Sequence, residues 1–306
     1  MLIPESAKGE RELIRRIGGI LSPSNPSLRV PFGDDMASVP SSELLWTVDT
    51  LMDGVDFDSR TQSWRLIGRK ALAVNLSDCA AMGATPVGAL CAVALANSVS
   101  MDAALELAAG MAELGSAHGC PIVGGDTNSW DAPTVISVTV AAACERPILR
   151  GGGRVGDRVF VTGPLGGSIL GRHLSFEPRV ALAKQLVEAG IPTSMIDISD
   201  GLSVDLGHIC DASNCGAMLD ASLIDAATHD DAQCLSAQTG KPPREHALHD
   251  GEDFELIVCC PPERAADCAR LGLLPLGELV AGTGLTMRDA DGGLCEIPRR
   301  GWEHFR

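Results

Sequence analysis

Residues 70–84, KALAVNLSDCAAMGA, carry the clearest structural signal in the sequence. If this stretch is helical, Ala71, Asn75, Asp78 and Met82 lie on one face, because residues three or four positions apart are neighbours. That face is small and apolar apart from the carboxylate, and an unpaired carboxylate is costly to bury there. The stretch therefore predicts a helix whose Asp78 has a special partner, either a cation or a neighbouring Lys70 or Arg69.

Outward from this stretch, the expected elements mix helices and strands. They are helices at 10–21, 63–82, 101–118, 179–189, 202–212 and 263–271, and strands at 44–48, 87–96, 122–123, 134–143, 158–162, 254–259 and around 274–285, with a loop at 124–127 and a turn at 197–201. Because they do not alternate strictly, the fold class is α+β or layered α/β. The glycine run 151–153 is the best boundary and divides the chain into residues 1–150 and 151–306.

Composition limits the possible partners. The 306 residues suit two domains, and the net charge of −16 disfavours nucleic acid and anionic membrane surfaces. Tyr is absent and aromatic residues make up 3% of the chain, which is poor material for stacking bases. If the substrates are phosphates, divalent cations must reverse the sign of the site.

The 11 cysteines favour a reducing compartment. They are dispersed, form no C-x-x-C pair and have no zinc spacing. The first ten residues lack an apolar signal region, and no run of about 18 apolar residues occurs. We therefore expect a soluble, cytoplasmic protein.

Acidic residues recur at loop ends beside glycines and apolar strands. A single Asp in such a place is ordinarily a turn former or a helix cap, but here the context repeats at Asp34, Asp35, Asp49, Asp78, Asp126, Asp197 and Asp200. Two carboxylates about 4 Å apart repel by roughly 4 kcal/mol at an effective dielectric near 20, so a shared pocket requires cations. Oxygen ligands without His or Cys select Mg²⁺, Ca²⁺ or Mn²⁺.

Residues 197–202 open the predicted helix at 202–212. Ser199 or Asp200 could simply cap it, but the first N–H groups of a helix also bind anions, which would place phosphate beside the carboxylates. No Gly-Lys-Ser/Thr loop and no protein-kinase motif occurs. Arg150 is either a phosphate clamp or an ordinary surface arginine, and His208 is interpreted as structural.

Six stretches, in order, carry a family resemblance: 33–35 (GDD), 48–51 (VDTL), 70–84, 124–127 (GGDT), 197–206 (DISDGLSVDL) and 251–256 (GEDFEL). Their order and spacing resemble those of thiamine-monophosphate kinases, within the superfamily that includes aminoimidazole ribonucleotide synthetase. The ending GWEHF at 301–305 is similar to the family's aromatic C-terminal signature. The resemblance spans nearly the whole chain.

The resemblance implies a reaction in which ATP and thiamine monophosphate give ADP and thiamine diphosphate. It implies several Mg²⁺ ions held by Asp35, Thr47, Val48, Asp49, Asp78, Asp126, Asp197 and Asp200, ATP contacts at Gly125, Asp126, Arg150 and Ser199, and thiamine contacts at Asp56, Glu252 and Trp302. It also implies a homodimer, in which strands of an N-terminal α+β domain form a barrel between subunits, and a C-terminal α/β domain. We expect direct in-line transfer without a general base, because a phosphate monoester is already ionised near pH 7.

Three departures from the family pattern fall on the acceptor side. Asp56 stands where the family usually has His, His249-Asp250 stands where it usually has Ser-Gly, and the stretch between Gly171 and Pro178 is short. His249 is one candidate to replace the missing imidazole. Two alternatives stay open: a superfamily relative that uses ATP on another acceptor, and a non-catalytic nucleotide-binding paralogue.

Overall fold

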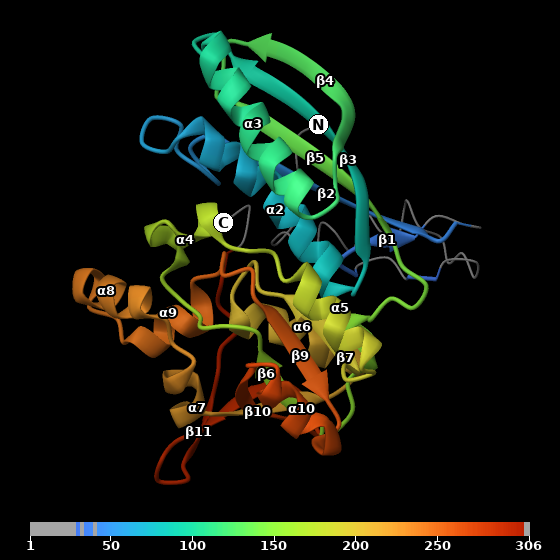
Figure 1. Ribbon diagram of the computed structural model, residues 1–306. Helices are drawn as coiled ribbons and strands as arrows, with labels where there is room; N and C mark the ends of the chain where they lie inside the picture. Colours follow the sequence, from blue (N-terminus) through green and yellow to red (C-terminus); the bar gives the residue numbers. More distant parts are fainter. Residues whose placement is uncertain (1–28, 31–33, 39–41, 303–306) are drawn as a thin grey trace, which may run out of the picture.

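Two β-sheets organise the molecule, and each is built from one half of the chain (Figure 1). The computed structural model describes residues 29–30, 34–38 and 42–302, so the helix expected at 10–21 lies outside the described residues. Every strand of the five-stranded sheet comes before residue 144, and every strand of the seven-stranded sheet comes after residue 157. The architecture is mixed α+β.

The five-stranded sheet has a helical layer on one face. Its order is β1 (Ala37–Ser38), β2 (Leu44–Met52), β5 (Val135–Ala143), β3 (Thr85–Ala96) and β4 (Ile122–Trp130), with α2 (Trp64–Ala81) and α3 (Met101–Ala117) packed against it. Neighbouring strands are antiparallel except β3 and β4, which are parallel. Strand β4 is therefore an edge strand.

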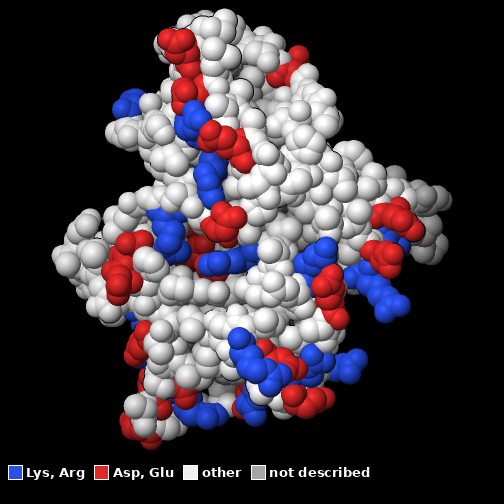
Figure 2. Space-filling view, viewed as in Figure 1, with Lys and Arg blue, Asp and Glu red and all other residues white. Residues whose placement is uncertain are grey.

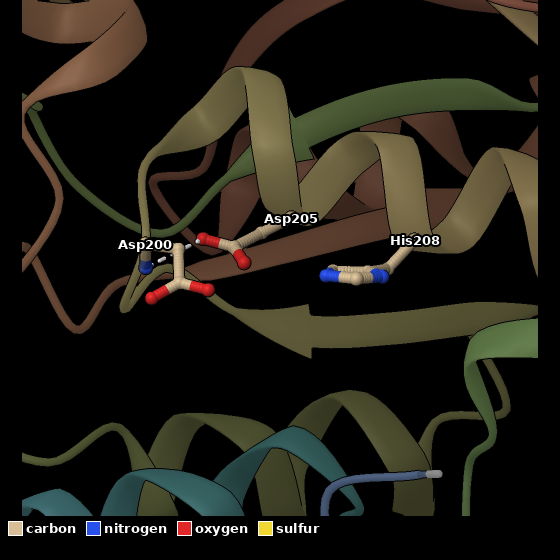
Figure 3. A group of neighbouring side chains, drawn as sticks. All are labelled: Asp200, Asp205 and His208. Carbon is tan, nitrogen blue, oxygen red and sulfur yellow. Dashed lines mark hydrogen bonds between the residues drawn. The ribbon is translucent and has the colours of Figure 1, made fainter. Parts of the chain in front are cut away.

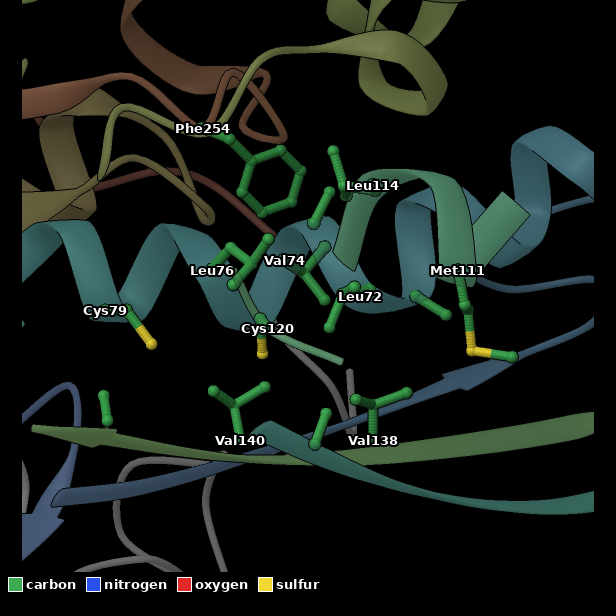
Figure 4. Packing of buried hydrophobic residues seen from close by; sticks show 14 of the residues in the cluster. Leu72, Val74, Leu76, Cys79, Met111, Leu114, Cys120, Val138, Val140 and Phe254 are labelled. Atoms are coloured by element: carbon green, nitrogen blue, oxygen red, sulfur yellow. The ribbon is translucent and has the colours of Figure 1, made fainter. Parts of the chain in front are cut away.

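Helix α2 is buried on nearly all sides, with 13 of its 18 residues inaccessible to solvent. Figure 4 shows Val138 and Val140 of β5 on one side of α2 and Phe254 from the C-terminal half on the other. Helix α3 approaches it closely at Gly68, where a Cβ atom would lie 2.0 Å from the carbonyl oxygen of Leu107. Asp78 itself is half-buried on this helix, between the buried residues Ser77 and Cys79.

The seven-stranded sheet is antiparallel apart from one pair, β8 and β11, so its half is α+β rather than the expected α/β. The strand order is β12 (Leu294–Glu296), β11 (Leu285–Arg288), β8 (Gly216–Asp220), β10 (Leu274–Val280), β6 (Arg158–Val161), β9 (Leu256–Cys260) and β7 (Ser194–Asp197). The α-helices of this half are α4 (Arg172–Ser175), α5 (Val180–Glu188), α6 (Leu202–Ser213), α7 (Ala221–Ala226), α8 (Asp230–Thr239), α9 (Pro243–His249) and α10 (Ala265–Arg270). Short 3₁₀ turns are η1 (Arg150–Gly152), η2 (Ser168–Leu170) and η3 (Pro262–Arg264).

Most predicted elements are confirmed to within two residues, but the loop predicted at 124–127 is wrong. These residues lie inside β4 and pair with β3, with Gly125 opposite Cys91. A Cβ atom on Gly125 would lie 1.8 Å from the carbonyl oxygen of Cys91, so this glycine permits close strand contact rather than a turn. Strand β2 also continues past Asp49 to Met52, and β7, β8 and α7 to α9 were not predicted.

Charged side chains of both signs are interspersed on the face seen in Figure 2, without a continuous basic stripe. Within the described residues, no helix is both long enough and apolar enough to cross a membrane. All 11 cysteines lie in described ranges, and none forms a disulfide.

Candidate active site

Four of the predicted carboxylates come together where the two halves meet. Asp35, Asp78 and Asp197 each place an oxygen within 4.8 Å of the others. They come from the segment before β1, from the buried face of α2 and from the end of β7. Asp49 of β2 belongs to the same electrostatic group, because its charge raises the pKa values of both Asp78 and Asp197. We call these four residues the carboxylate cluster.

Three carboxyl groups of the carboxylate cluster have raised pKa values. Burial, followed by the charges of Asp56 and Asp35, raises the pKa of Asp49 to about 6. Burial and the charge of Asp35 raise the pKa of Asp197 to about 7, and burial with three neighbouring carboxylates raises that of Asp78 well above its usual range. Carboxylates forced together in this way gain strongly from a bound cation.

Neutral and cationic groups fix the geometry of the carboxylate cluster. The hydroxyl of Thr47 donates to Oδ2 of Asp78, and Ser77 Oγ donates to Oδ2 of Asp197 at 2.6 Å. Nη2 of Arg150 donates to Oδ1 of Asp35 at 2.5 Å. Arg150 therefore belongs to this site and is not an ordinary surface arginine.

The ion-pair alternative for Asp78 is wrong. Arg69 bonds to Glu177 at 3.1 Å, and Lys70 bonds to Glu252 at 2.5 Å. Neither side chain bonds to Asp78 within the part of the chain that the structure describes.

The residues of the carboxylate cluster fit divalent cations. Oδ2 of Asp35 is buried and has no hydrogen-bond partner among the described residues, and Arg150 is the cation bonded to the cluster. The atoms of the cluster that could coordinate a metal ion are carboxylate and hydroxyl oxygens, the ligand type that Mg²⁺ prefers. A group of like charges with an unsatisfied oxygen is the arrangement that a metal ion would complete.

A second acidic group begins α6 and contains Asp200, Asp205 and His208 (Figure 3). Oδ2 of Asp205 accepts hydrogen bonds from the backbone N–H groups of Asp200 at 3.1 Å and Gly201 at 3.0 Å. The alternative that Ser199 or Asp200 simply caps this helix is therefore wrong. Gly201 occupies the cap position with a φ of 118°, and Asp205 satisfies the free backbone donors from the first turn. The sequence analysis did not identify Asp205. An acidic residue in the first turn of a predicted helix is the signal that could have identified it.

Asp205 offers a clear test of structural against metal-binding roles. Burial and the charges of Asp200 and Asp197 raise the pKa of Asp205 well above its usual range, so a neutral side chain suits the position. Asp205→Asn keeps an oxygen for both bonds, and we expect kcat/KM within about fivefold of the unmodified enzyme. Asp205→Ala leaves two buried N–H groups unpaired and should cost about 2–4 kcal/mol of unfolding free energy.

Urea unfolding and steady-state kinetics on both variants measure these outcomes. If Asp205→Asn lost as much activity as Asp205→Ala, the charge itself would be required. Asp205 would then be a metal ligand rather than the support of the loop that carries Asp200.

A cavity of about 410 Å³ adjoins the carboxylate cluster at Asp49 and is lined by both halves of the chain. Its lining includes these predicted site residues: Asp49, Asp56, Ser199, Asp200, Glu252 and Trp302. Asp49 and Asp200 mark its acidic region. The cavity therefore brings together two predicted metal residues, one predicted ATP residue and the three predicted acceptor residues.

Glu252 lines this cavity. Its backbone is strained, and its carboxylate contacts two buried side chains. Its φ is 52°, unusual for a residue other than glycine, and its N–H donates to the carbonyl of Ser199 at 2.7 Å. Its carboxylate lies 2.5 Å from Nζ of Lys70 and 3.2 Å from Nδ1 of His173. Burial alone would raise the pKa of Glu252, but the bonds from His173 and Lys70 outweigh it and lower that pKa.

The imidazole next to Glu252 belongs to His173, which the sequence did not reveal. His249 instead bonds to the hydroxyl of Ser203 at 2.8 Å and lines a different cavity of about 550 Å³. The suggestion that His249 replaces an imidazole at the acceptor position is therefore wrong. The contact between Lys70 and Glu252 was not predicted either. The only indication in the sequence was a lysine within an otherwise apolar stretch.

Three predicted metal or ATP residues do not join the carboxylate cluster through their side chains. Asp126 and Gly125 lie on β4, three strands from Asp49, which is about 14 Å at the usual strand spacing. The register also places Asp126 on the opposite face of the sheet, because Gly125 shares a face with Asp49. Val48 likewise faces away from α2 with 60% exposure, so only its backbone carbonyl could serve as a ligand.

A family model described as "AIR synthase related protein, N-terminal domain" matches residues 33–144, which include three residues of the carboxylate cluster. Residues 33–144 are thus similar to the N-terminal domain of AIR synthase related proteins. A thiamine-monophosphate kinase from Rhodopirellula baltica is 41% identical over 295 residues, covering 91% of this chain and 92% of that protein. One from Escherichia coli K12 is 31% identical over 330 residues, covering 98% and 99%. The chain belongs to the thiamine-monophosphate kinase family.

Solved structures agree with this assignment. The structure of AaThiL complexed with AMPPCP and TMP has a TM-score of 0.86, with 28% identity and complete coverage of both chains. The hydrogenase maturation protein HypE in complex with ATP has a TM-score of 0.71 at 19% identity and covers 99% of this chain and 98% of its own, so it shares the fold alone.

Proposed function

We propose that this enzyme transfers the γ-phosphoryl group of ATP to thiamine monophosphate, giving thiamine diphosphate and ADP. The observation that carries the proposal is the adjacency of two unlike groups around one cavity of about 410 Å³: the acidic Asp49 and Asp200, and the acceptor pair Glu252 and Trp302. The related structure that holds AMPPCP, an ATP analogue, together with TMP supports the same pairing of ligands.

The residues divide the work between the two phosphates. Asp35, Asp49, Asp78 and Asp197, with Asp200 nearby, would hold Mg²⁺ ions, and such ions supply the positive charge that brings two polyanions together and stabilises the transferred group. Arg150 bonds to Asp35 and would contact nucleotide phosphate, as would Ser199 in the cavity wall. The side chains act by positioning, and no general base is required because the acceptor phosphate is already ionised near pH 7.

The acceptor end suits a cationic ring. Trp302 is half exposed at the cavity, and an indole is the best aromatic partner for a cation. Glu252 and Asp56 line the same cavity and add carboxylates. The thiazolium of thiamine carries the complementary positive charge.

Incubation of the pure enzyme with ATP, Mg²⁺ and thiamine monophosphate tests the proposal, with thiamine diphosphate and ADP as the expected products. ATP binding without product would leave a superfamily enzyme for another acceptor, an alternative that the Asp56 departure favours. Absence of ATP binding would contradict both the thiamine-monophosphate kinase and the enzyme with another acceptor. Trapping a phosphorylated enzyme during turnover would contradict direct transfer.

We further propose a homodimer, in which the uncovered face of the five-stranded sheet meets a second copy to form a barrel. This face exposes Val48 by 60%, Leu90 by 45% and Met52 by 38%, more apolar surface than a sheet face in water normally shows. Among the strands of residues 29–30, 34–38 and 42–302, β4 is an edge of this sheet, so its outer backbone groups have no strand partner there. Because Asp126 lies on this same face, its side chain would reach a nucleotide site only in the dimer.

Two further assignments belong to this proposal. The 11 free cysteines support a reducing, cytoplasmic location. The confinement of each sheet to one half of the chain supports domains at 1–150 and 151–306.

Asp56→His tests whether the unusual acceptor residue is a neutral departure. Oδ2 of Asp56 accepts a hydrogen bond from the N–H of Met52 at 2.7 Å, so the carboxylate closes the turn after β2. We expect His at this position to lower kcat/KM for thiamine monophosphate by about tenfold, since the turn bond and one negative charge are both lost. The KM for ATP should stay within twofold.

Asp58→His is the matched control, because Asp58 lies on the same loop but pairs with Arg60 outside the cavity. A rise in activity for Asp56→His would show that Asp56 has no role of its own.

A further inference from the structure

Lys70 is the most completely enclosed charged group in the described structure. Its side chain has 0% exposure, although it sits on α2 between the two halves of the molecule. A buried ammonium group is costly unless every proton has a partner and an opposite charge lies near. The residues around Lys70 therefore indicate what its burial achieves.

The ammonium group of Lys70 lies within hydrogen-bond distance of three polar atoms from three separate segments. Nζ donates to Oε1 of Glu252 at 2.5 Å and to the carbonyl oxygen of Asp56 at 2.7 Å, and it lies 2.9 Å from Nδ1 of His173. These partners come from the segment before β9, the turn after β2 and helix α4. One side chain thus joins both halves of the chain behind the acceptor cavity.

Lys70 does not itself line the cavity, but two of its three partners do. Glu252 and Asp56 both face the space of about 410 Å³, on the side that also contains Trp302. The backbone at Glu252 is strained, with a φ of 52°, and Phe254 two residues later has a φ of 50°. Such a segment needs fixed contacts to keep one conformation. Lys70 supplies a contact for the Glu252 carboxylate.

We propose that Lys70 is a positioning residue that sets acceptor affinity, by holding the Glu252 carboxylate and the Asp56 turn in the geometry that receives a cationic ring. This inference rests on the proposed function. His173 completes the arrangement, because its Nδ1 lies between Nζ of Lys70 at 2.9 Å and the Glu252 carboxylate at 3.2 Å, and its Nε2 is buried without a hydrogen-bond partner among the described residues. The carboxylate cluster is bonded by Thr47, Ser77 and Arg150 instead, so Lys70 acts on the acceptor rather than on ATP.

The test separates the KM values of the two substrates. Lys70→Met keeps the length of the side chain and removes its charge and donors. We expect the KM for thiamine monophosphate to rise at least tenfold while the KM for ATP stays within twofold. Lys184→Met, an exposed lysine on α5, is the control and should change neither KM.

A double-mutant cycle keeps the proposal testable if Lys70→Met folds poorly. Combining Lys70→Met with Glu252→Gln removes both charges, so the double variant should be more stable than Lys70→Met alone. It should also lose no more acceptor affinity than Glu252→Gln alone. His173→Asn provides a further variant and should raise only the acceptor KM, by about threefold to tenfold.

Each result has a separate meaning. Equal rises in both KM values, or additive losses in the cycle, would show that Lys70 only supports the fold and would overturn the proposal. An unchanged acceptor KM in a folded Lys70→Met enzyme would overturn it too. If the unmodified enzyme did not phosphorylate thiamine monophosphate, the proposed function would fail and this inference with it.

Discussion

Replacing Asp78 by Asn is expected to lower kcat/KM by at least about 10³-fold and, at the same time, to make the metal-free enzyme more stable. The activity falls because an amide oxygen cannot supply the negative charge that holds Mg²⁺, and 10³-fold corresponds to about 4 kcal/mol of lost transition-state stabilisation. The stability rises because Asp78 is buried against Asp49, Asp197 and Asp35, which repel it. An amide of the same shape removes that repulsion.

Kinetics with both substrates and thermal unfolding with and without Mg²⁺ measure the two effects. A loss of activity combined with a gain in stability is diagnostic, because most core substitutions lower both activity and stability. Asp102→Asn, the same chemical change on the exposed first turn of α3, is the control and should alter neither quantity. Retained activity in Asp78→Asn would remove this residue from the metal site and weaken the kinase proposal itself.

Asp78 also shows why part of the site could be predicted from sequence. A carboxylate at helical spacing among small apolar residues has few acceptable explanations, and the structure leaves only the cluster. The same logic, applied to acidic residues at the ends of apolar strands, correctly brought Asp35, Asp49 and Asp197 together. Burial cost is a local property, so the sequence around each residue is enough to detect it.

Strand register and long-range partners could not be predicted in this way. Asp126 stands in the same glycine-rich context as the others, yet pairing with β3 places it on the far face of the sheet. Lys70 meets Glu252 across 182 residues of chain and His173 across 103. No local pattern announces such meetings, because they depend on how two sheets pack around α2.

The fold was predictable to a similar extent. Helix α2 has capping Ser63 and an unbroken run of helix-compatible residues, so its bounds agree with the prediction. The loop predicted at 124–127 was wrong because glycine taken alone signals a turn, whereas the close approach of β3 requires a glycine at position 125 within a strand. The errors at Gly125 and Asp126 both concern residues whose role is decided by a neighbouring strand.

Removing Mg²⁺ should make the enzyme progressively less stable as the pH rises from about 4 to about 7. In the metal-free fold, the pKa of Asp49 is raised to about 6 and that of Asp197 to about 7, so both carry protons that the unfolded chain releases near pH 4. The folded state therefore binds more protons than the unfolded state across this window. The contribution of these two groups to the free energy of unfolding is fully present below pH 4. It is lost as the pH rises through their two folded-state pKa values.

The expected loss is on the order of 7 kcal/mol at pH 8, since the two pKa values are raised from about 4 to about 6 and about 7 and each pKa unit corresponds to about 1.4 kcal/mol per group. Added Mg²⁺ should restore it increasingly with pH, because metal ions bind the deprotonated carboxylates. Asp253 complicates the slope, as burial raises its pKa to about 7 outside the carboxylate cluster. That portion should persist when Mg²⁺ is present.

Urea unfolding at several pH values, with EDTA or Mg²⁺, separates the two contributions. Asp197→Asn should flatten the slope measured in EDTA and reduce the gain from Mg²⁺, whereas Asp253→Asn should flatten the slope equally under both conditions. A metal-free enzyme whose stability did not fall between pH 4 and pH 7 would contradict the tight proton binding of the cluster. The cluster would then tolerate its own charges without cations, and the physical reason for placing Mg²⁺ beside Asp78 would be lost.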